Sequence, residues 1–152
     1  NPNIPMVGIV SRLVSQKGLD LISFMMPEIV NENLQLVVLG TGENQYQSMF
    51  HYYDSHYPSK VSANITFDSS LAQQIYAASD IFLMPSLFEP CGLSQMMSLR
   101  YGTIPIVRET GGLKDSVQPF NEFDGTGTGF SFANYNAHEM MDTMMIKING
   151  MV

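Results

Sequence analysis

Short runs of apolar residues alternate along the chain with segments whose apolar residues recur at helical spacing. The apolar runs predict five strands, which cover residues 6–10, 34–39, 63–67, 81–84 and 104–107. Because apolar residues occupy consecutive rather than alternate positions in these runs, the pattern is typical of parallel strands covered by helices on both faces.

Two helices are predicted between these strands. Apolar residues at spacing i, i+3, i+4, i+7 and i+8 indicate a helix over residues 22–30. A shorter stripe indicates a second helix over residues 71–78, and Ser69 or Ser70 is the expected N-cap because a hydroxyl can accept a backbone N–H at that position.

The clearest stripe predicts a helix over residues 137–148, where Asn136 with Glu139 resembles a capping box. This stripe contains four of the twelve methionines, in two doublets. Methionine residues at helical spacing commonly fill gaps in a hydrophobic core. We therefore interpret the methionines as core residues rather than as ligands of a metal.

Strands and helices that alternate with short connections predict βαβ units in one open parallel sheet. The expected fold is therefore a Rossmann-like α/β domain, with helices on both faces of the sheet. The chain has 152 residues, which is the length of a single domain, so residues 1–152 are expected to form one domain. Ligands of such sheets bind outside the carboxyl ends of the strands, so the loops that follow the strands are the places to look for a site.

The loop after the first strand contains Arg12 and Lys17, two of only seven cationic side chains. Arginine offers a planar fork to phosphate oxygens and lysine a compact charge. Together they could neutralise a diphosphate as its negative charge grows on departure. Two solvated surface cations would have the same spacing, so the spacing alone leaves both interpretations open.

The loop after the second strand begins Gly40-Thr41-Gly42, like the start of a dinucleotide-binding fingerprint. The third glycine of that fingerprint would stand at position 45, which is Gln45. This departure disfavours a nicotinamide-dependent dehydrogenase. A tight strand-to-helix turn explains the two glycines.

Between residues 85 and 93, Pro90 and Gly92 mark a turn that opens a helix, whose first N–H groups are available to anions or hydroxyls. Glu89 stands before them and could either accept hydrogen bonds from a polyol or cap the helix. Cys91 is a poor candidate nucleophile, because no local motif pairs it with a base.

After the fifth strand, the paired glycines Gly111 and Gly112 would let the backbone approach a ligand closely, and Thr110 offers a hydroxyl. A plain turn explains the same residues. The three histidines lack carboxylate or cysteine partners at ligand spacing, so no metal site is predicted.

Composition narrows the possible partners. A net charge of −7 argues against a broad basic face for nucleic acid or an anionic membrane. No apolar run approaches the roughly 18 residues that span a bilayer. A single cysteine cannot form an internal disulfide, which favours a reducing compartment.

Four segments, in this order, resemble the carboxyl-terminal domain of bacterial glycogen synthases and plant starch synthases, which are retaining glycosyltransferases with the two-lobed GT-B fold. The matching segments are residues 10–20, 88–95, 101–105 and 110–115. The most specific is Phe-Glu-Pro-Cys-Gly-Leu at 88–93. Other GT-B families carry a second glutamate eight positions after Glu89, where this chain has Met97.

The resemblance implies a role for each matching residue. Arg12 and Lys17 would hold the diphosphate of a nucleotide-sugar and stabilise it as it leaves, and Glu89 would bind glucose hydroxyls. The adenine would stack at the end of the third strand, on Phe67, where the family often has tyrosine. The remaining substrate contacts are expected from Cys91, Gly92, Leu93, Thr110, Gly111 and Gly112.

The family transfers glucose from a nucleotide-sugar, usually ADP-glucose in bacteria, to an α-1,4-glucan without a metal, and no cofactor is expected. UDP-glucose or another nucleotide-sugar is an alternative donor, and a catalytically silent nucleotide-binding module is an alternative function. In this family an amino-terminal lobe binds the glucan. We therefore expect this chain to be a fragment, the carboxyl-terminal donor lobe without its terminal helices, which does not elongate glucan by itself. The resemblance also implies that the location is the bacterial cytoplasm, or a plastid for a plant protein.

Overall fold

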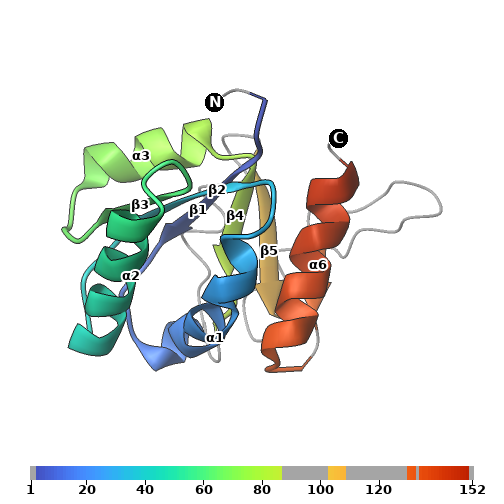
Figure 1. Ribbon diagram of the computed structural model, residues 1–152, viewed down its shortest axis with the longest axis horizontal. Helices are drawn as coiled ribbons and strands as arrows, with labels where there is room; N and C mark the ends of the chain where they lie inside the picture. Colours follow the sequence, from blue (N-terminus) through green and yellow to red (C-terminus); the bar gives the residue numbers. More distant parts are fainter. Residues whose placement is uncertain (1–2, 87–102, 109–129, 133, 151–152) are drawn as a thin grey trace.

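The computed structural model describes residues 3–86, 103–108, 130–132 and 134–150 (Figure 1). Its centre is a six-stranded sheet with the order β3-β2-β1-β4-β5-β6, in which every neighbouring pair is parallel. The strands are β1 (Met6–Val10), β2 (Gln35–Leu39), β3 (Val61–Asn64), β4 (Ile81–Met84), β5 (Ile104–Arg108) and β6 (Phe130–Phe132). The predicted open parallel sheet is confirmed.

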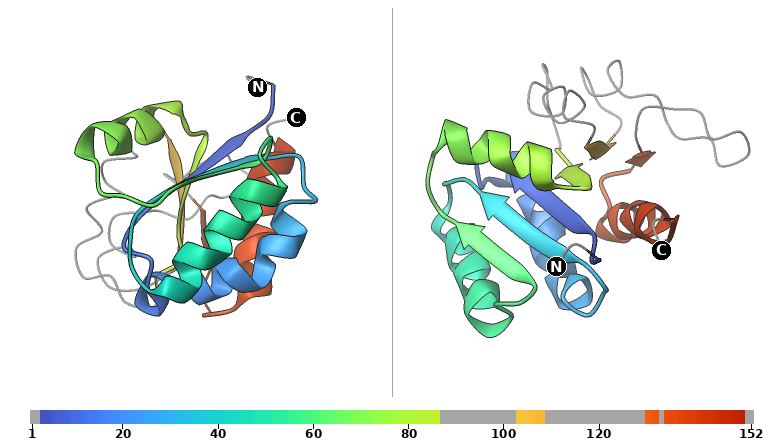
Figure 2. Two further views of the ribbon diagram at one scale, coloured as in Figure 1. Left: turned by 60° about the vertical axis from the view of Figure 1, so that its left-hand side comes forward. Right: turned by 90° about the horizontal axis from the view of Figure 1, so that it is seen from above.

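Helices cover both faces of this sheet (Figure 2). One face carries α1 (Leu19–Ile29), α2 (Asn44–His56) and α6 (Ala137–Gly150), and the other carries α3 (Ser69–Ala78). A short 3-10 turn, η1 (Ser15–Lys17), precedes α1. The Rossmann-like α/β class predicted from the sequence is therefore correct.

The larger core cluster lies between the sheet and the helices α1, α2 and α6. Methionines of α1 and α6 fill much of it: Met26 and Met140 are fully buried and Met144 is 1% exposed. This burial confirms that the methionine doublets of α1 and α6 are core residues. A smaller cluster of Tyr76, Phe82, Met84 and Val107 lies on the α3 face.

The third strand begins and ends earlier than predicted. It was expected over residues 63–67, but β3 is Val61–Asn64. After Asn64 the backbone turns on itself, because the Thr66 N–H donates to the Asn64 carbonyl at 3.0 Å instead of to β2. The apolar side chain of Phe67 extended the run that predicted a buried strand, but its ring is 92% exposed.

The expected cap of α3 was also wrong. The N-cap is Asp68, whose Oδ1 accepts the Leu71 N–H at 3.0 Å, and Ser69 is already the first helical residue. At α6 the prediction is half confirmed: Asn136 Oδ1 accepts the His138 and Glu139 N–H groups. Glu139 instead accepts the Asn134 N–H at 3.5 Å, so the reciprocal half of the capping box is absent.

Two elements, α2 and β6, had no apolar pattern that predicted them. Only Tyr46 and Phe50 of α2 are buried, so the helix lacks the wide apolar stripe that reveals α1. β6 has only three residues, which is too short to show a period.

Candidate functional site

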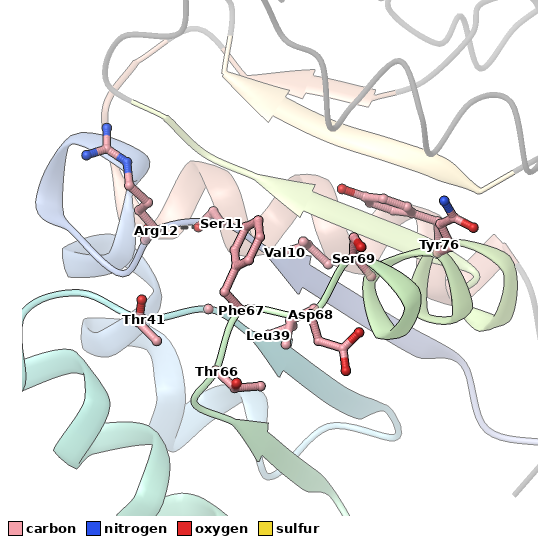
Figure 3. A pocket seen from close by; sticks show the side chains of 13 residues that line it. Val10, Ser11, Arg12, Leu39, Thr41, Thr66, Phe67, Asp68, Ser69 and Tyr76 are labelled. Carbon is pink, nitrogen blue, oxygen red and sulfur yellow. Dashed lines mark hydrogen bonds between the residues drawn. The ribbon is translucent and has the colours of Figure 1, made fainter.

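The carboxyl ends of three neighbouring strands enclose a pocket of about 340 Å³ (Figure 3). Each strand and the loop after it supply part of the wall, and the first turns of α3 close one side. The lining includes Val10, Ser11, Arg12, Leu39, Thr41, Thr66, Phe67, Asp68, Ser69 and Tyr76. This is the edge of the sheet at which the sequence predicted ligand binding.

The loop that carries Arg12 is held against the loop after β2. Ser11 N–H donates to the Leu39 carbonyl at 3.2 Å, and Leu13 N–H donates to the Thr41 carbonyl at 2.8 Å. Arg12 lies between these two bonds, with its side chain exposed at the rim of the pocket. Its backbone is therefore fixed, while the guanidinium remains accessible to a ligand.

The Gly40-Thr41-Gly42 turn allows this close approach. A Cβ at Gly40 would lie 1.8 Å from the Ser11 carbonyl oxygen, and one at Gly42 would lie 2.3 Å from the Leu13 carbonyl oxygen. Both glycines are needed so that the two loops can pair. The strand-to-helix turn therefore explains them without a dinucleotide fingerprint.

Lys17 belongs to the same loop as Arg12, but its backbone is held by a different contact. It is the last residue of η1 and is half-buried. The next residue, Gly18, has φ 83°, and a Cβ on it would lie 2.2 Å from the Pro85 carbonyl oxygen. The turn therefore packs directly against the chain that leaves β4.

Phe67 stands at the mouth of the pocket. Its ring projects between Arg12 and Tyr76 in Figure 3, and all three residues line the cavity. A ring that is 92% exposed contributes little to the core. One face is therefore available to a flat ligand.

A cluster of hydroxyl groups lies behind the Lys17 turn. The single hydroxyl proton of Tyr135 is shared between two acceptors, the Ser15 carbonyl oxygen at 3.0 Å and the Asp20 carboxylate. The Tyr46 hydroxyl and Ser15 Oγ are hydrogen-bonded at 2.5 Å. Burial, and then the hydrogen bond to Asp20 and its charge, raise the pKa of Tyr135, although the Arg108 guanidinium opposes this.

Sequence reasoning did not find Tyr135 or Tyr46. Tyr135 is separated from Ser15 by 120 residues and from Asp20 by 115, so no local spacing links them. The nearest signal in the sequence was the predicted cap at Asn136, the residue that follows Tyr135.

The other predicted site residues lie outside the described residues. These are Glu89, Cys91, Gly92, Leu93, Thr110, Gly111 and Gly112. The described chain leaves β4 at Ser86 and β5 at Arg108, and the parallel pairing of Met84 with Val107 puts both strand ends at the pocket's edge of the sheet.

Within the described ranges, no group of three or more histidine, cysteine, aspartate or glutamate side chains could hold a metal ion. Among the same residues, no helix is both long enough and apolar enough to cross a bilayer.

Comparison with known proteins gives the family. Residues 1–148 match the family of group 1 glycosyl transferases. The chain belongs to this family. This glycosyltransferase chain is 73% identical over 138 residues to a glycogen synthase of Clostridioides difficile, which covers 91% of the chain and 29% of that protein. It is 58% identical over 149 residues to a glycogen synthase of Streptococcus uberis, covering 98% of the chain and 31% of that protein.

Solved structures agree with the family. The catalytic domain of starch synthase IV from Arabidopsis thaliana, bound to ADP and acarbose, superposes with a TM-score of 0.87 at 37% identity, covering 98% of this chain and 31% of that one. Sucrose-phosphate synthase from Thermosynechococcus elongatus, at 21% identity and a TM-score of 0.80, shares the fold, and the match covers 99% of this chain and 38% of that one. The predicted fold class, one lobe of a GT-B glycosyltransferase, is confirmed. The glycosyltransferase chain spans less than a third of the glycogen synthases that it matches.

Proposed function

We propose that this chain is the donor-binding lobe of a glycogen synthase, an enzyme that transfers glucose from ADP-glucose to the non-reducing end of an α-1,4-glucan with retention of configuration. The observation that carries the proposal is the pocket at the ends of β1, β2 and β3, with Arg12 on its rim and the Phe67 ring at its mouth. High identity to glycogen synthases supports the same conclusion.

The pocket is proposed to take the nucleoside. Its volume of about 340 Å³ lies within the range of small-molecule sites, roughly 300–1,000 Å³. Base stacking on an exposed aromatic ring needs no further side-chain contact, because every base has a π-face. Phe67 would supply that ring, and Thr41 and Thr66 add hydroxyls to the wall.

Arg12 and Lys17 are proposed to hold the diphosphate. Breaking the bond between the sugar and the diphosphate leaves more negative charge on the departing group, and fixed cations lower the energy of that state. The pairing of Ser11 and Leu13 with the β2 loop fixes the backbone of Arg12. The contact of Gly18 with Pro85 fixes the turn of Lys17.

The sugar is proposed to lie beyond the diphosphate, where β4 and β5 end. Glu89 would accept hydrogen bonds from glucose hydroxyls, and the backbone of Cys91, Gly92 and Leu93 would contact the ring. Thr110 and Gly111 would lie beside the phosphates, and Gly112 would be a further substrate contact. These roles follow from the resemblance, and they assign the leaving-group stabilisation to cations rather than to a metal.

The glucan is proposed to bind mainly outside this chain, which spans less than a third of its relatives. Starch synthase IV, which was solved with ADP and acarbose, supports a site made for both a nucleotide and a glucan. The chain alone is then expected to bind nucleotide and not to elongate glucan. The bacterial cytoplasm is the proposed location, since a single cysteine suits a reducing compartment.

Calorimetric titration of the 152-residue chain with ADP, UDP, AMP and adenosine tests the donor site. ADP should bind more tightly than UDP or AMP, and Arg12→Ala and Lys17→Ala should each weaken ADP binding. Lys147→Ala is the matched control, because it also removes one cation, and Lys147 lies in the last turn of α6 and is not among the residues that line the pocket. Equal binding of ADP and UDP would reopen the identity of the donor, and loss of affinity in the control would contradict the assignment to Arg12 and Lys17.

Catalysis is tested in the full-length glycogen synthase that contains this chain. Lys17→Ala should lower kcat at least about 100-fold, which corresponds to roughly 3 kcal/mol of transition-state stabilisation. An unchanged kcat would contradict the leaving-group role and favour a silent nucleotide-binding module.

A further inference from the structure

The turn that carries Lys17 has little stability of its own. η1 has three residues, none of them buried, and its backbone bonds are Lys17 N–H to the Val14 carbonyl at 3.0 Å and Gly18 N–H to the Ser15 carbonyl at 2.9 Å. Short 3-10 turns have poor hydrogen-bond geometry. Contacts from elsewhere in the chain must therefore fix the direction in which Lys17 leaves the backbone.

Tyr135 supplies such a contact, both to the turn and to the helix that follows it. Its hydroxyl donates to the carbonyl of Ser15, the first residue of η1, at 3.0 Å. The same proton is shared with the carboxylate of Asp20, in the first turn of α1. One phenol oxygen therefore ties the beginning of the Lys17 turn to the helix that follows it.

The ring of Tyr135 is itself held by rigid elements. The Arg108 guanidinium carbon, at the end of β5, lies 5.5 Å from the ring centroid. Asn136, the next residue along the chain, caps α6 with bonds of 2.9 and 3.1 Å. A tyrosine with the ordinary pKa of 10.0 is already protonated at neutral pH, and burial and Asp20 raise the pKa of Tyr135 further, so its hydroxyl remains a donor.

Tyr46 of α2 provides a second anchor. Its hydroxyl is 2.5 Å from Ser15 Oγ, and the residue is 5% exposed. Ser15 is thus held through its side chain by one tyrosine and through its carbonyl by another.

We propose that Tyr135 is a positioning residue, which fixes the Ser15–Lys17 turn and so orients the Lys17 ammonium toward the diphosphate of the bound nucleotide. The inference rests on the proposed role of Lys17. A lysine side chain is long and flexible, so a fixed backbone origin limits the number of conformations that must be lost when the diphosphate binds.

The first test does not depend on any nucleotide. Amide hydrogen exchange is measured by NMR for Lys17 and Gly18 in the wild-type chain and in Tyr135→Phe, which keeps the ring and removes the hydroxyl. Exchange at both amides should become at least about 5-fold faster, the effect of losing one net hydrogen bond. Tyr52→Phe is the control, since Tyr52 is 53% exposed on α2 and its ring contacts Tyr53 and His56 of the same helix.

The second test separates positioning from general stability. Tyr135→Phe should weaken ADP binding about 5-fold while adenosine binding changes less than 2-fold, because adenosine lacks the diphosphate. In the Lys17→Ala background the same substitution should cause no further loss of ADP affinity. If Tyr135→Phe does not fold, Tyr46→Phe is measured in the same way, with smaller changes of the same sign.

Unchanged exchange at Lys17 and Gly18 would overturn the proposal, and so would equal losses of ADP and adenosine affinity. A loss that adds fully to that of Lys17→Ala would also overturn it, because Tyr135 would then act independently of Lys17. If the wild-type chain binds neither ADP nor adenosine, the proposed function fails instead, and hydrogen exchange alone decides whether Tyr135 holds the turn.

Discussion

At the scale of single residues, Phe67 is both strongly exposed and part of the pocket wall. It is the most exposed of the large apolar side chains that the structure describes, and it lines a pocket. Base–aromatic stacking contributes about 1–3 kcal/mol by alanine substitution. We predict that Phe67→Ala weakens ADP binding at least about 5-fold, as measured by calorimetry.

Phe67→Tyr is the matched variant, because it keeps the stacking ring and adds the hydroxyl that the family often has. Its ADP affinity should stay within about 2-fold of the wild type if stacking is what the ring supplies. Because the side chain is exposed, neither substitution should change the free energy of unfolding by more than about 0.5 kcal/mol. An unchanged affinity in Phe67→Ala would remove the ring from the proposed site.

Gly18 is the second residue whose backbone matters for the site. Its φ of 83° disfavours any side chain, and a Cβ would meet the Pro85 carbonyl oxygen at 2.2 Å. We predict that Gly18→Ala lowers the free energy of unfolding by at least about 1–2 kcal/mol in urea denaturation, because the left-handed conformation alone has that cost.

Gly150→Ala is the control for this substitution. No atom of the described residues lies within 4 Å of a Cβ at Gly150, the last residue of α6, so the free energy of unfolding should stay the same or rise slightly. If Gly18→Ala were as stable as Gly150→Ala, the contact between the Lys17 turn and the end of β4 would not be tight.

At the scale of elements, the start of α3 joins stability to the pocket. Asp68 caps the helix through the Leu71 N–H and also lines the cavity. We predict that Asp68→Ala lowers the free energy of unfolding by about 1 kcal/mol, and that Asp68→Asn lowers it by only a few tenths, because both aspartate and asparagine are good N-caps. Equal losses in the two variants would show that the charge, rather than the cap, is what stabilises the helix.

The elements with a wide apolar stripe or a continuous apolar run were predictable from the sequence. α1, α6, β1, β4 and β5 fall close to where the pattern put them. The errors have two causes. One is an apolar residue that is exposed rather than buried, as at Phe67. The other is a helix start with several polar residues that could each be the N-cap, as at Asp68, Ser69 and Ser70. The pattern cannot tell which candidate oxygen will reach a free N–H, because that depends on where β3 ends.

The buried stripe of α6 gives a direct test of its orientation. Met144 is 1% exposed against α1 and the sheet, while Ile146, two positions on, is 54% exposed. We predict that Met144→Ala lowers the free energy of unfolding by about 2–5 kcal/mol and that Ile146→Ala changes it by less than about 0.5 kcal/mol. Chemical denaturation of both variants measures this, and similar losses would contradict the assigned face.

At the scale of the whole molecule, strand order decides which loops meet. The loops after the strands were predicted as candidate sites, and Arg12 after β1 and Phe67 after β3 do line one pocket. The Tyr135 network was not predictable, because it joins residues 115 and 120 positions apart through the return of α6 toward α1. A local motif can identify a loop, whereas the residues that contact that loop from distant parts of the chain are determined by the fold.

The same network should make global stability depend on alkaline pH. The pKa of Tyr135 is raised in the folded chain, chiefly by burial and then by Asp20, above the value of 10.0 for an unperturbed tyrosine. Above pH 10 the unfolded chain therefore releases this proton first, the native state binds more protons, and the free energy of unfolding falls as pH rises. Below pH 10 both states keep the proton, so the contribution is fully present. We predict that urea denaturation between pH 9 and 11 shows a shallower decline for Tyr135→Phe than for the wild type. Identical slopes for the two chains would show that folding does not raise the pKa of Tyr135.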